Sequence, residues 1–133
     1  MATFIENSRK QLERKEAAHL AIVDDKDEYL GTVSLKNIDK KAKDAEYAIS
    51  LRSAYHGKGI GKIATRLILE YAFDELGLSR VYLNVLSDNV RAIALYEKCG
   101  FQFEREEKDC LKIKGKTVSL KWYSITNGEG KIK

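Results

Sequence analysis

The sequence predicts a mixed α/β (α+β) fold, with a single twisted mixed sheet flanked by a small number of helices. Three observations carry this prediction. Alternating apolar residues mark an antiparallel meander before a glycine-rich loop, two amphipathic helical segments follow that loop, and two apolar stretches around Lys114-Gly115-Lys116 read as a C-terminal hairpin. The predicted order of elements is α-β-β-β-α-β-α-β-β.

The first half of the chain reads as one helix and three strands. Thr3 and Glu6 fit a capping box, which predicts a helix from Thr3 to about Lys15. Polar turns at 24–27 and 37–43 separate the strands that follow. These strands are expected at Ala18 to Val23, Tyr29 to Leu35 and Ala45 to Leu51.

The second half contains the clearest helix of the sequence. Apolar residues recur at helical spacing from Ile60 to Leu76, and Gly77 is a natural C-terminal stop. Asp88 or Asn89 is suited to cap a shorter helix that runs through Lys98 and ends at Gly100. The remaining strands are expected at Val81 to Leu86, Phe101 to Ile113 and Thr117 to Ile125.

Composition indicates one soluble domain over residues 1–133. Apolar residues make up 44% and charged residues 33% of the 133 positions, which is typical of a globular protein. No apolar run approaches the roughly 18 residues of a membrane span, and the start of the chain is too polar for a secretory signal. We therefore expect a cytoplasmic protein that has no membrane partner.

Charge and cysteine usage narrow the function classes. The net charge of +4 is spread along the chain among acidic residues, so an anionic cofactor is favoured and nucleic-acid binding is the weaker interpretation. Cys99 and Cys110 have no His or Cys partners at ligand spacing. We expect two reduced thiols and no metal site.

Gly57, Gly59 and Gly61 form a loop between a strand and the long helix. Glycine lets a backbone approach a ligand closely, and the free N–H groups of a first helical turn favour phosphate. With Lys58 and Lys62 adding positive charge, the segment predicts a diphosphate-binding loop. A Walker loop is excluded because Ile63 follows Lys62. A dinucleotide motif and a plain turn remain weaker alternatives.

Two motifs of this sequence resemble the GNAT acetyltransferase superfamily. His56-Gly57-Lys58-Gly59-Ile60-Gly61 is similar to the family pattern [Q/R]-x-x-G-x-[G/A], with His56 where Gln or Arg is usual. The segment from Asn84 to Phe101 is similar to the later half of the family, with the pattern N-x-x-A-[I/L]-x-L-Y-x-K-x-G-F. The resemblance runs from about Phe4 to Ile125. It is strongest to the branch of ribosomal-protein alanine, spermidine and amino-sugar acetyltransferases.

The resemblance implies an N-acetyltransferase that moves an acetyl group from acetyl-coenzyme A to a primary amine. The acceptor class stays open among a protein N-terminus, an amino sugar and a small amine. The implied cofactor-binding set comprises the backbone of a strand that pairs with the pantetheine arm, the glycine loop and the start of the short helix. Its residues are Ile49, Ser50, Leu51, His56, Gly57, Lys58, Gly59, Ile60, Gly61, Lys62, Asn89, Arg91 and Tyr96. Asn89 has an alternative role as a helix cap.

Acetyl transfer needs a base for the amine and an acid for the departing thiolate. Tyr96 stands where the family has its general acid, and Glu46 is the best candidate for the base. Asn84 is expected to orient the acceptor or a water molecule. The competing interpretations are a packing tyrosine and a solvated carboxylate, and His19 and His56 are weaker candidates for the base.

The resemblance also implies a strand and a helix before Thr3, and this sequence does not show them. We therefore expect an open sheet edge, covered by a second subunit of a homodimer or blunted by charges. The alternative to an enzyme is a noncatalytic acyl-coenzyme A-binding or regulatory module on the same fold.

Overall fold

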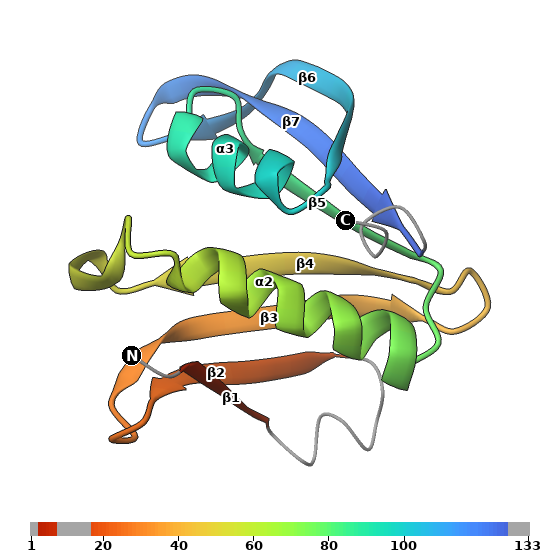
Figure 1. Cartoon of the computed structure of the whole chain (residues 1–133). Helices are drawn as coiled ribbons and strands as arrows, with labels where there is room; N and C mark the ends of the chain where they lie inside the picture. Colours follow the sequence, from red (N-terminus) through yellow and green to blue (C-terminus); the bar gives the residue numbers. More distant parts are fainter. Residues whose placement is uncertain (1–2, 8–16, 128–133) are drawn as a thin grey trace.

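The computed structural model describes residues 3–7 and 17–127 of the chain. Within these residues seven strands form one sheet of order β1-β2-β3-β4-β5-β7-β6. Every neighbouring pair is antiparallel except β4 and β5, which are parallel (Figure 1). The strands are β1 (Thr3–Asn7), β2 (Ala18–Asp24), β3 (Tyr29–Asp39), β4 (Asp44–Leu51), β5 (Arg80–Leu86), β6 (Gln102–Ile113) and β7 (Lys116–Thr126).

Two α-helices lie in the described chain, and both pack on the same face of the sheet. They are α2 (Ile60–Glu70) and α3 (Val90–Lys98), and a short 3-10 turn, η1 (Ser53–Tyr55), precedes α2. The long helix predicted up to Leu76 is confirmed in place, but its last turn widens into a π-helical segment, η2 (Tyr71–Glu75). The predicted stop is confirmed, because Gly77 adopts a left-handed φ of 68°.

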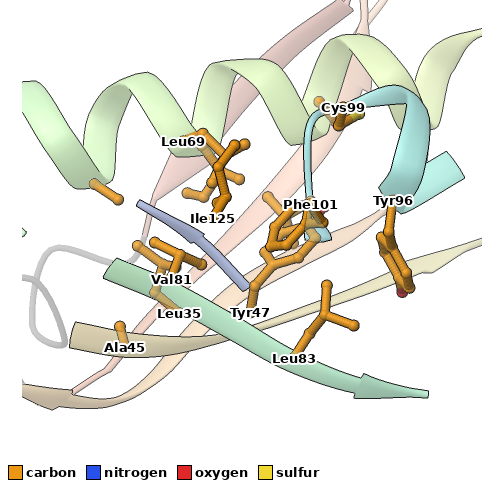
Figure 2. Packing of buried hydrophobic residues seen from close by; sticks show 14 of the residues in the cluster. Leu35, Ala45, Tyr47, Leu69, Val81, Leu83, Tyr96, Cys99, Phe101 and Ile125 are labelled. Carbon is orange, nitrogen blue, oxygen red and sulfur yellow. The ribbon is translucent and has the colours of Figure 1, made fainter. Parts of the chain in front are cut away.

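The core lies between the helices and this face of the sheet. Ile68 of α2, Leu35 of β3 and Leu83 of β5 are almost fully buried in one apolar cluster. Figure 2 shows Leu35 and Leu83 within this cluster. The hydroxyl groups of Tyr47 on β4 and Thr65 on α2 lie 2.7 Å apart inside it. Buried and partly buried residues alternate along β5, so every second side chain points to the opposite face of the sheet. That face carries no helix in the described part of the chain.

The sheet splits between its two parallel strands. β4 and β5 pair only where residues 44–46 lie beside residues 80–82. Beyond that point the strands diverge, and Figure 1 shows β4 and β5 separating toward the end that carries the glycine loop. The two parallel strands are therefore splayed apart beyond residues 46 and 82. The separation leaves the C-terminal end of β4 without a strand neighbour on one side among the described residues.

The helix predicted from Thr3 to about Lys15 is wrong for residues 3–7, the part of it that the structure describes. Thr3–Asn7 forms strand β1, antiparallel to β2, instead of the start of a helix. The edge of β2 offers unpaired backbone groups, and a segment beginning Thr-Phe-Ile has the residue types that suit a strand, so pairing prevails over the capping box. The remainder of the predicted helix, residues 8–15, lies outside the described residues.

Strand β1 also changes the prediction of an open edge. The outer side of β2 is covered by residues 3–7 of the same chain, so a second subunit is not needed for that purpose. A homodimer is still a prediction, but the open edge of β2 no longer supports it. No helix of the described residues is long and apolar enough to cross a membrane. Cys99 and Cys110 are both free thiols, as expected, the first buried and the second exposed.

Candidate active site

A cavity of about 720 Å³ lies between the end of β4, the glycine loop and α3. It brings together most of the residues expected to bind the cofactor: Ile49, Ser50, Leu51, His56, Gly57, Gly59, Gly61, Lys62, Asn89, Arg91 and Tyr96. Two expected members do not line it. The ammonium group of Lys58 lies 6.0 Å from the centre of the Tyr55 ring, and the side chain of Ile60 is buried in the core.

The glycine loop has the geometry that its sequence predicts. Gly57 and Gly59 adopt φ angles of 75° and 79°, a region that side-chain-bearing residues rarely visit. A Cβ added at either position would meet nothing within 4 Å, so the loop is bare on that side. Gly59 is the N-cap of α2, so no side chain caps the first N–H groups of that helix. Those groups and the helix dipole are suited to a diphosphate.

His56 links two walls of the cavity. One nitrogen, Nε2, lies 3.0 Å from the carbonyl oxygen of Leu51, and the other, Nδ1, lies 2.6 Å from Nη1 of Arg91 on α3. A guanidinium can only donate, so Nδ1 accepts and Nε2–H donates to the carbonyl, which fixes a neutral tautomer. A residue expected to act beside phosphate therefore also holds the end of β4 to the start of α3.

The end of β4 offers a free edge to this cavity. Residues 49–51 pair with residues 31–33 of β3 on one side. On the other side β5 pairs only as far as Tyr82, so the backbone groups of residues 49–51 face the split. An extended amide-containing chain can add to such an edge as an extra strand. Asn89, also at this cavity, caps α3 by accepting the N–H of Ala92 at 3.2 Å.

Tyr96 lies deep in the cavity wall. Its ring packs edge-on against Tyr47, at a centroid distance of 6.3 Å, and against Phe101 at 5.9 Å (Figure 2). Burial, with a smaller effect of Cys99, raises the pKa of the Tyr96 phenol above its ordinary value. The phenol is therefore protonated throughout the neutral range, and a group in that state can give a proton to a thiolate.

Glu46 and Asn84 lie together on the other face of the sheet. Nδ2 of Asn84 donates to one carboxylate oxygen of Glu46 at 3.4 Å, and Nδ2 of Asn37 donates to the other at 3.1 Å. Nζ of Lys36 is 3.9 Å from the same carboxylate, whose side chain is 20% exposed. Neither Glu46 nor Asn84 lines the cavity. The structure thus joins these two candidates to each other and separates them from Tyr96 by the thickness of the sheet.

Sequence reasoning missed several members of the site. Lys36 and Asn37 were expected outside the strands, yet β3 continues to Asp39 through a register shift, with Asn37 at a φ of 52°. Four further residues of α3 also line the cavity, which are Ala92, Ala94, Leu95 and Lys98. Leu95 and Lys98 lie four and seven residues after Arg91, so helical spacing from Arg91 is the signal that could have found these two. His19, the other candidate base, bonds to Ser34 Oγ at 2.8 Å and does not line the cavity.

Comparison with known proteins identifies the family. Residues 1–102 match the model of the acetyltransferase (GNAT) domain, so the chain belongs to this family. It is 34% identical over 99 residues to the putative ribosomal N-acetyltransferase YdaF of Bacillus subtilis, covering 74% of this chain and 54% of that protein. It is 38% identical over 79 residues to the spermidine N(1)-acetyltransferase of Escherichia coli K12, covering 59% of this chain and 42% of that protein.

Solved structures agree with the sequence matches. Spermidine N-acetyltransferase of Vibrio cholerae in complex with coenzyme A and spermine superposes with a TM-score of 0.84 at 27% identity, covering 91% of this chain and 72% of that one. A chimera of the spermidine N-acetyltransferase of Vibrio cholerae and hSSAT gives a TM-score of 0.87 at 26% identity, covering 94% of this chain and 75% of that one. The predicted GNAT fold is confirmed. The chain spans about half the length of the curated relatives it matches.

Proposed function

We propose that this chain is an acetyl-coenzyme A-dependent N-acetyltransferase that acetylates a primary amine by direct attack on the thioester. The observation that carries the proposal is the split between β4 and β5. A bare glycine loop and a free strand edge lie on one side of it, and a carboxylate lies on the other. Membership of the acetyltransferase family and the coenzyme A-bound neighbour support the choice of cosubstrate.

The residues of the cavity fit coenzyme A. The left-handed glycines and the uncapped first turn of α2 suit its diphosphate, with Lys62 and Arg91 supplying positive charge. The free edge of residues 49–51 suits the amide groups of the pantetheine arm. Asn89 already caps α3, so its contact with the cofactor would add to that role.

The proposed reaction needs two proton transfers. The nitrogen of the neutral amine forms a bond to the thioester carbonyl carbon, and the carbon–sulfur bond then breaks. The proton lost by the amine goes to Glu46, directly or through water, and the departing thiolate takes a proton from Tyr96. Asn84 donates to the Glu46 carboxylate and so positions the proposed base. The raised pKa of Tyr96 keeps its proton available for this step.

The test is release of free coenzyme A thiol in the presence of acetyl-coenzyme A and a panel of primary amines. We expect Tyr96→Phe to lower kcat about 100-fold, and Glu46→Gln to lower kcat/KM to a similar degree, because each removes one proton transfer. Tyr29→Phe is the matched control. It removes the hydroxyl of an exposed tyrosine that lies outside the cavity lining, and should retain full activity.

Each outcome separates the alternatives. Unchanged rates in both variants would remove the assigned roles of Tyr96 and Glu46. Tight binding of coenzyme A without turnover of any amine would point to a noncatalytic acyl-coenzyme A-binding module.

We also propose that residues 1–133 act as one domain and associate as a homodimer. Light scattering of the purified chain tests the assembly, and a monomer across the concentration range would reject it.

A further inference from the structure

A lysine of the chain itself lies beside the candidate base. Lys36 of β3 is the register partner of Glu46 on β4, and its Nζ is 3.9 Å from Oε2 of the Glu46 carboxylate. Nδ2 of Asn84 donates to the same oxygen, at 3.4 Å, from β5 across the split. A primary amine of this protein therefore lies on the uncovered face, next to the group that we propose to deprotonate an acceptor.

The contact is loose enough for the ammonium group of Lys36 to move. A separation of 3.9 Å is longer than a hydrogen bond, and the Lys36 side chain is 44% exposed. Exposed ion pairs contribute little to stability, and lysine carries its nitrogen on a flexible four-carbon stem. The nitrogen can therefore leave this position and turn toward the split at little cost in free energy.

Glu46 is held more firmly than Lys36. Nδ2 of Asn37 donates to its Oε1 at 3.1 Å and Asn84 donates to its Oε2, so each oxygen of the carboxylate has an amide donor. The Glu46 side chain is 20% exposed. A carboxylate has about four acceptor positions, so Glu46 can still accept a proton. A fixed carboxylate and a mobile nitrogen are the arrangement that a base and its incoming amine require.

The attachment to β3 gives Lys36 an advantage over amines in solution. A group joined to its site by a short flexible linkage has an effective concentration in the millimolar range there. The pairing of β3 with β4 sets Lys36 opposite Glu46, so this amine does not have to be bound first. When a free acceptor is scarce, Lys36 is already in place beside the base.

We propose that Lys36 is a self-acetylation site, modified by the acetyl-coenzyme A that the same chain binds. Its ammonium first loses one proton to water, and the neutral Nζ then forms a bond to the thioester carbonyl carbon. The carbon–sulfur bond breaks as a second proton passes from Nζ to Glu46. The departing thiolate takes a proton from Tyr96, which regains one from water, so the products are an amide at Nζ and free coenzyme A.

This inference rests on the proposed acetyltransferase function and adds an amine of the protein to the acceptors of the same site. Mass spectrometry tests it without any free acceptor. The protein is incubated with acetyl-coenzyme A alone, and acetylation of each lysine is followed over time. Lys40 is the matched control, because it is exposed in the turn that follows β3. We expect Lys36 to be acetylated about 100-fold faster than Lys40, since Glu46 serves it as a base. Equal rates would overturn the inference.

Variants separate enzymatic from chemical acetylation. Tyr96→Phe and Glu46→Gln should each slow acetylation of Lys36 about 100-fold and leave that of Lys40 unchanged. Lys36→Arg keeps the positive charge and removes the amine, so this protein should not gain the early acetyl group. A folded Glu46→Gln protein that modifies Lys36 at the wild-type rate contradicts the proposal. Thermal unfolding of each variant confirms that it is folded.

Dilution shows whether the transfer occurs within one chain. At saturating acetyl-coenzyme A, the rate constant for Lys36 should be the same at every protein concentration. A Tyr96→Phe chain mixed with the wild-type protein should stay unmodified at Lys36. A rate constant that rises with protein concentration would reject self-acetylation, because Lys36 would then be a substrate of a different molecule.

Free amines separate this inference from the proposed function. An amine that is acetylated well must reach Glu46, so at saturation it should slow the modification of Lys36. If amines are acetylated while Lys36 stays unmodified, only self-acetylation fails. If neither a free amine nor Lys36 gains an acetyl group, the proposed function itself fails.

Discussion

Replacing Gly31 with alanine tests how closely the strand that faces the proposed cofactor is packed. Gly31 lies on β3 opposite Leu51 of β4. A Cβ at this position would lie 2.3 Å from the carbonyl oxygen of Ser50 and 2.9 Å from Cα of Leu51. Both are backbone atoms, so a rotamer change cannot relieve the contact. The end of β4 must move instead.

The size of that movement sets the expected effect. Ordinary contact distances are near 3.5 Å, so the backbone at Ser50 must shift by roughly 1 Å. Overpacking of this kind costs about 2–3 kcal/mol. For a chain of this length we expect the melting temperature to fall by roughly 6–9 °C. Because residues 49–51 form the free edge at the cavity, coenzyme A affinity should fall as well, about 10-fold.

Thermal unfolding and calorimetric titration with coenzyme A measure the two effects. Gly115→Ala is the control, since Gly115 also resists substitution, through a φ of 78°, but has open space around its Cβ position. It should cost about 1 kcal/mol and leave coenzyme A binding unchanged. Adding Leu51→Ala to Gly31→Ala should not restore stability, because the closest clash is with the backbone. A Gly31→Ala protein that melts with the wild type would refute the reasoning.

Three further results are expected. His56→Leu should weaken coenzyme A binding about 10-fold. His56→Gln should retain it, because a carboxamide can donate and accept as the neutral ring does. Equal affinities of these two variants in calorimetry would contradict this role of His56. Tyr47→Phe should lower the free energy of unfolding in urea by about 1–3 kcal/mol, since it leaves the buried Thr65 hydroxyl without this partner. The double variant Tyr47→Phe with Thr65→Val should lose less stability than the sum of the two single variants. Burial raises the pKa of Tyr47, Tyr96 and Cys99, so the folded state keeps protons that the unfolded state releases. The contribution of these three groups to stability should therefore be constant below their ordinary pKa values of about 8.5–10 and be lost above them; a melting temperature that does not fall between about pH 8 and 11 would be inconsistent with these shifts.

The sequence predicted those parts of the fold that depend on neighbouring residues. Helical periodicity after Gly61, the stop at Gly77 and the cap at Asn89 are local signals, and each has its expected geometry. The left-handed hairpin turn at Lys114 and Gly115 belongs to the same group, with φ angles of 52° and 78°. These features form from interactions within a few residues, so a single sequence is sufficient to predict them.

Features that depend on distant pairing were missed or incomplete. The segment from Thr3 has a plausible capping box, and only the exposed edge of β2 explains why residues 3–7 pair as a strand. The environment of Glu46 is similar. Its partners Lys36 and Asn37 come from a strand extension, and Asn84 comes from a strand that lies 38 positions further along the chain. Side-chain contacts of this kind follow from register, which local patterns do not determine.

The split between β4 and β5 explains why the candidate site has two faces. Side chains alternate along a strand, so Tyr47 turns toward Tyr96 while its neighbour Glu46 turns to the uncovered face. In a continuous sheet, a layer of backbone would separate Tyr96 from Glu46. Because pairing stops after Glu46 and Tyr82, the layer opens beside the residues that we propose as acid and base, so that groups on the two faces could act on one bound thioester and its attacking amine. Closing this split should abolish acetyl transfer even with every proposed catalytic side chain present.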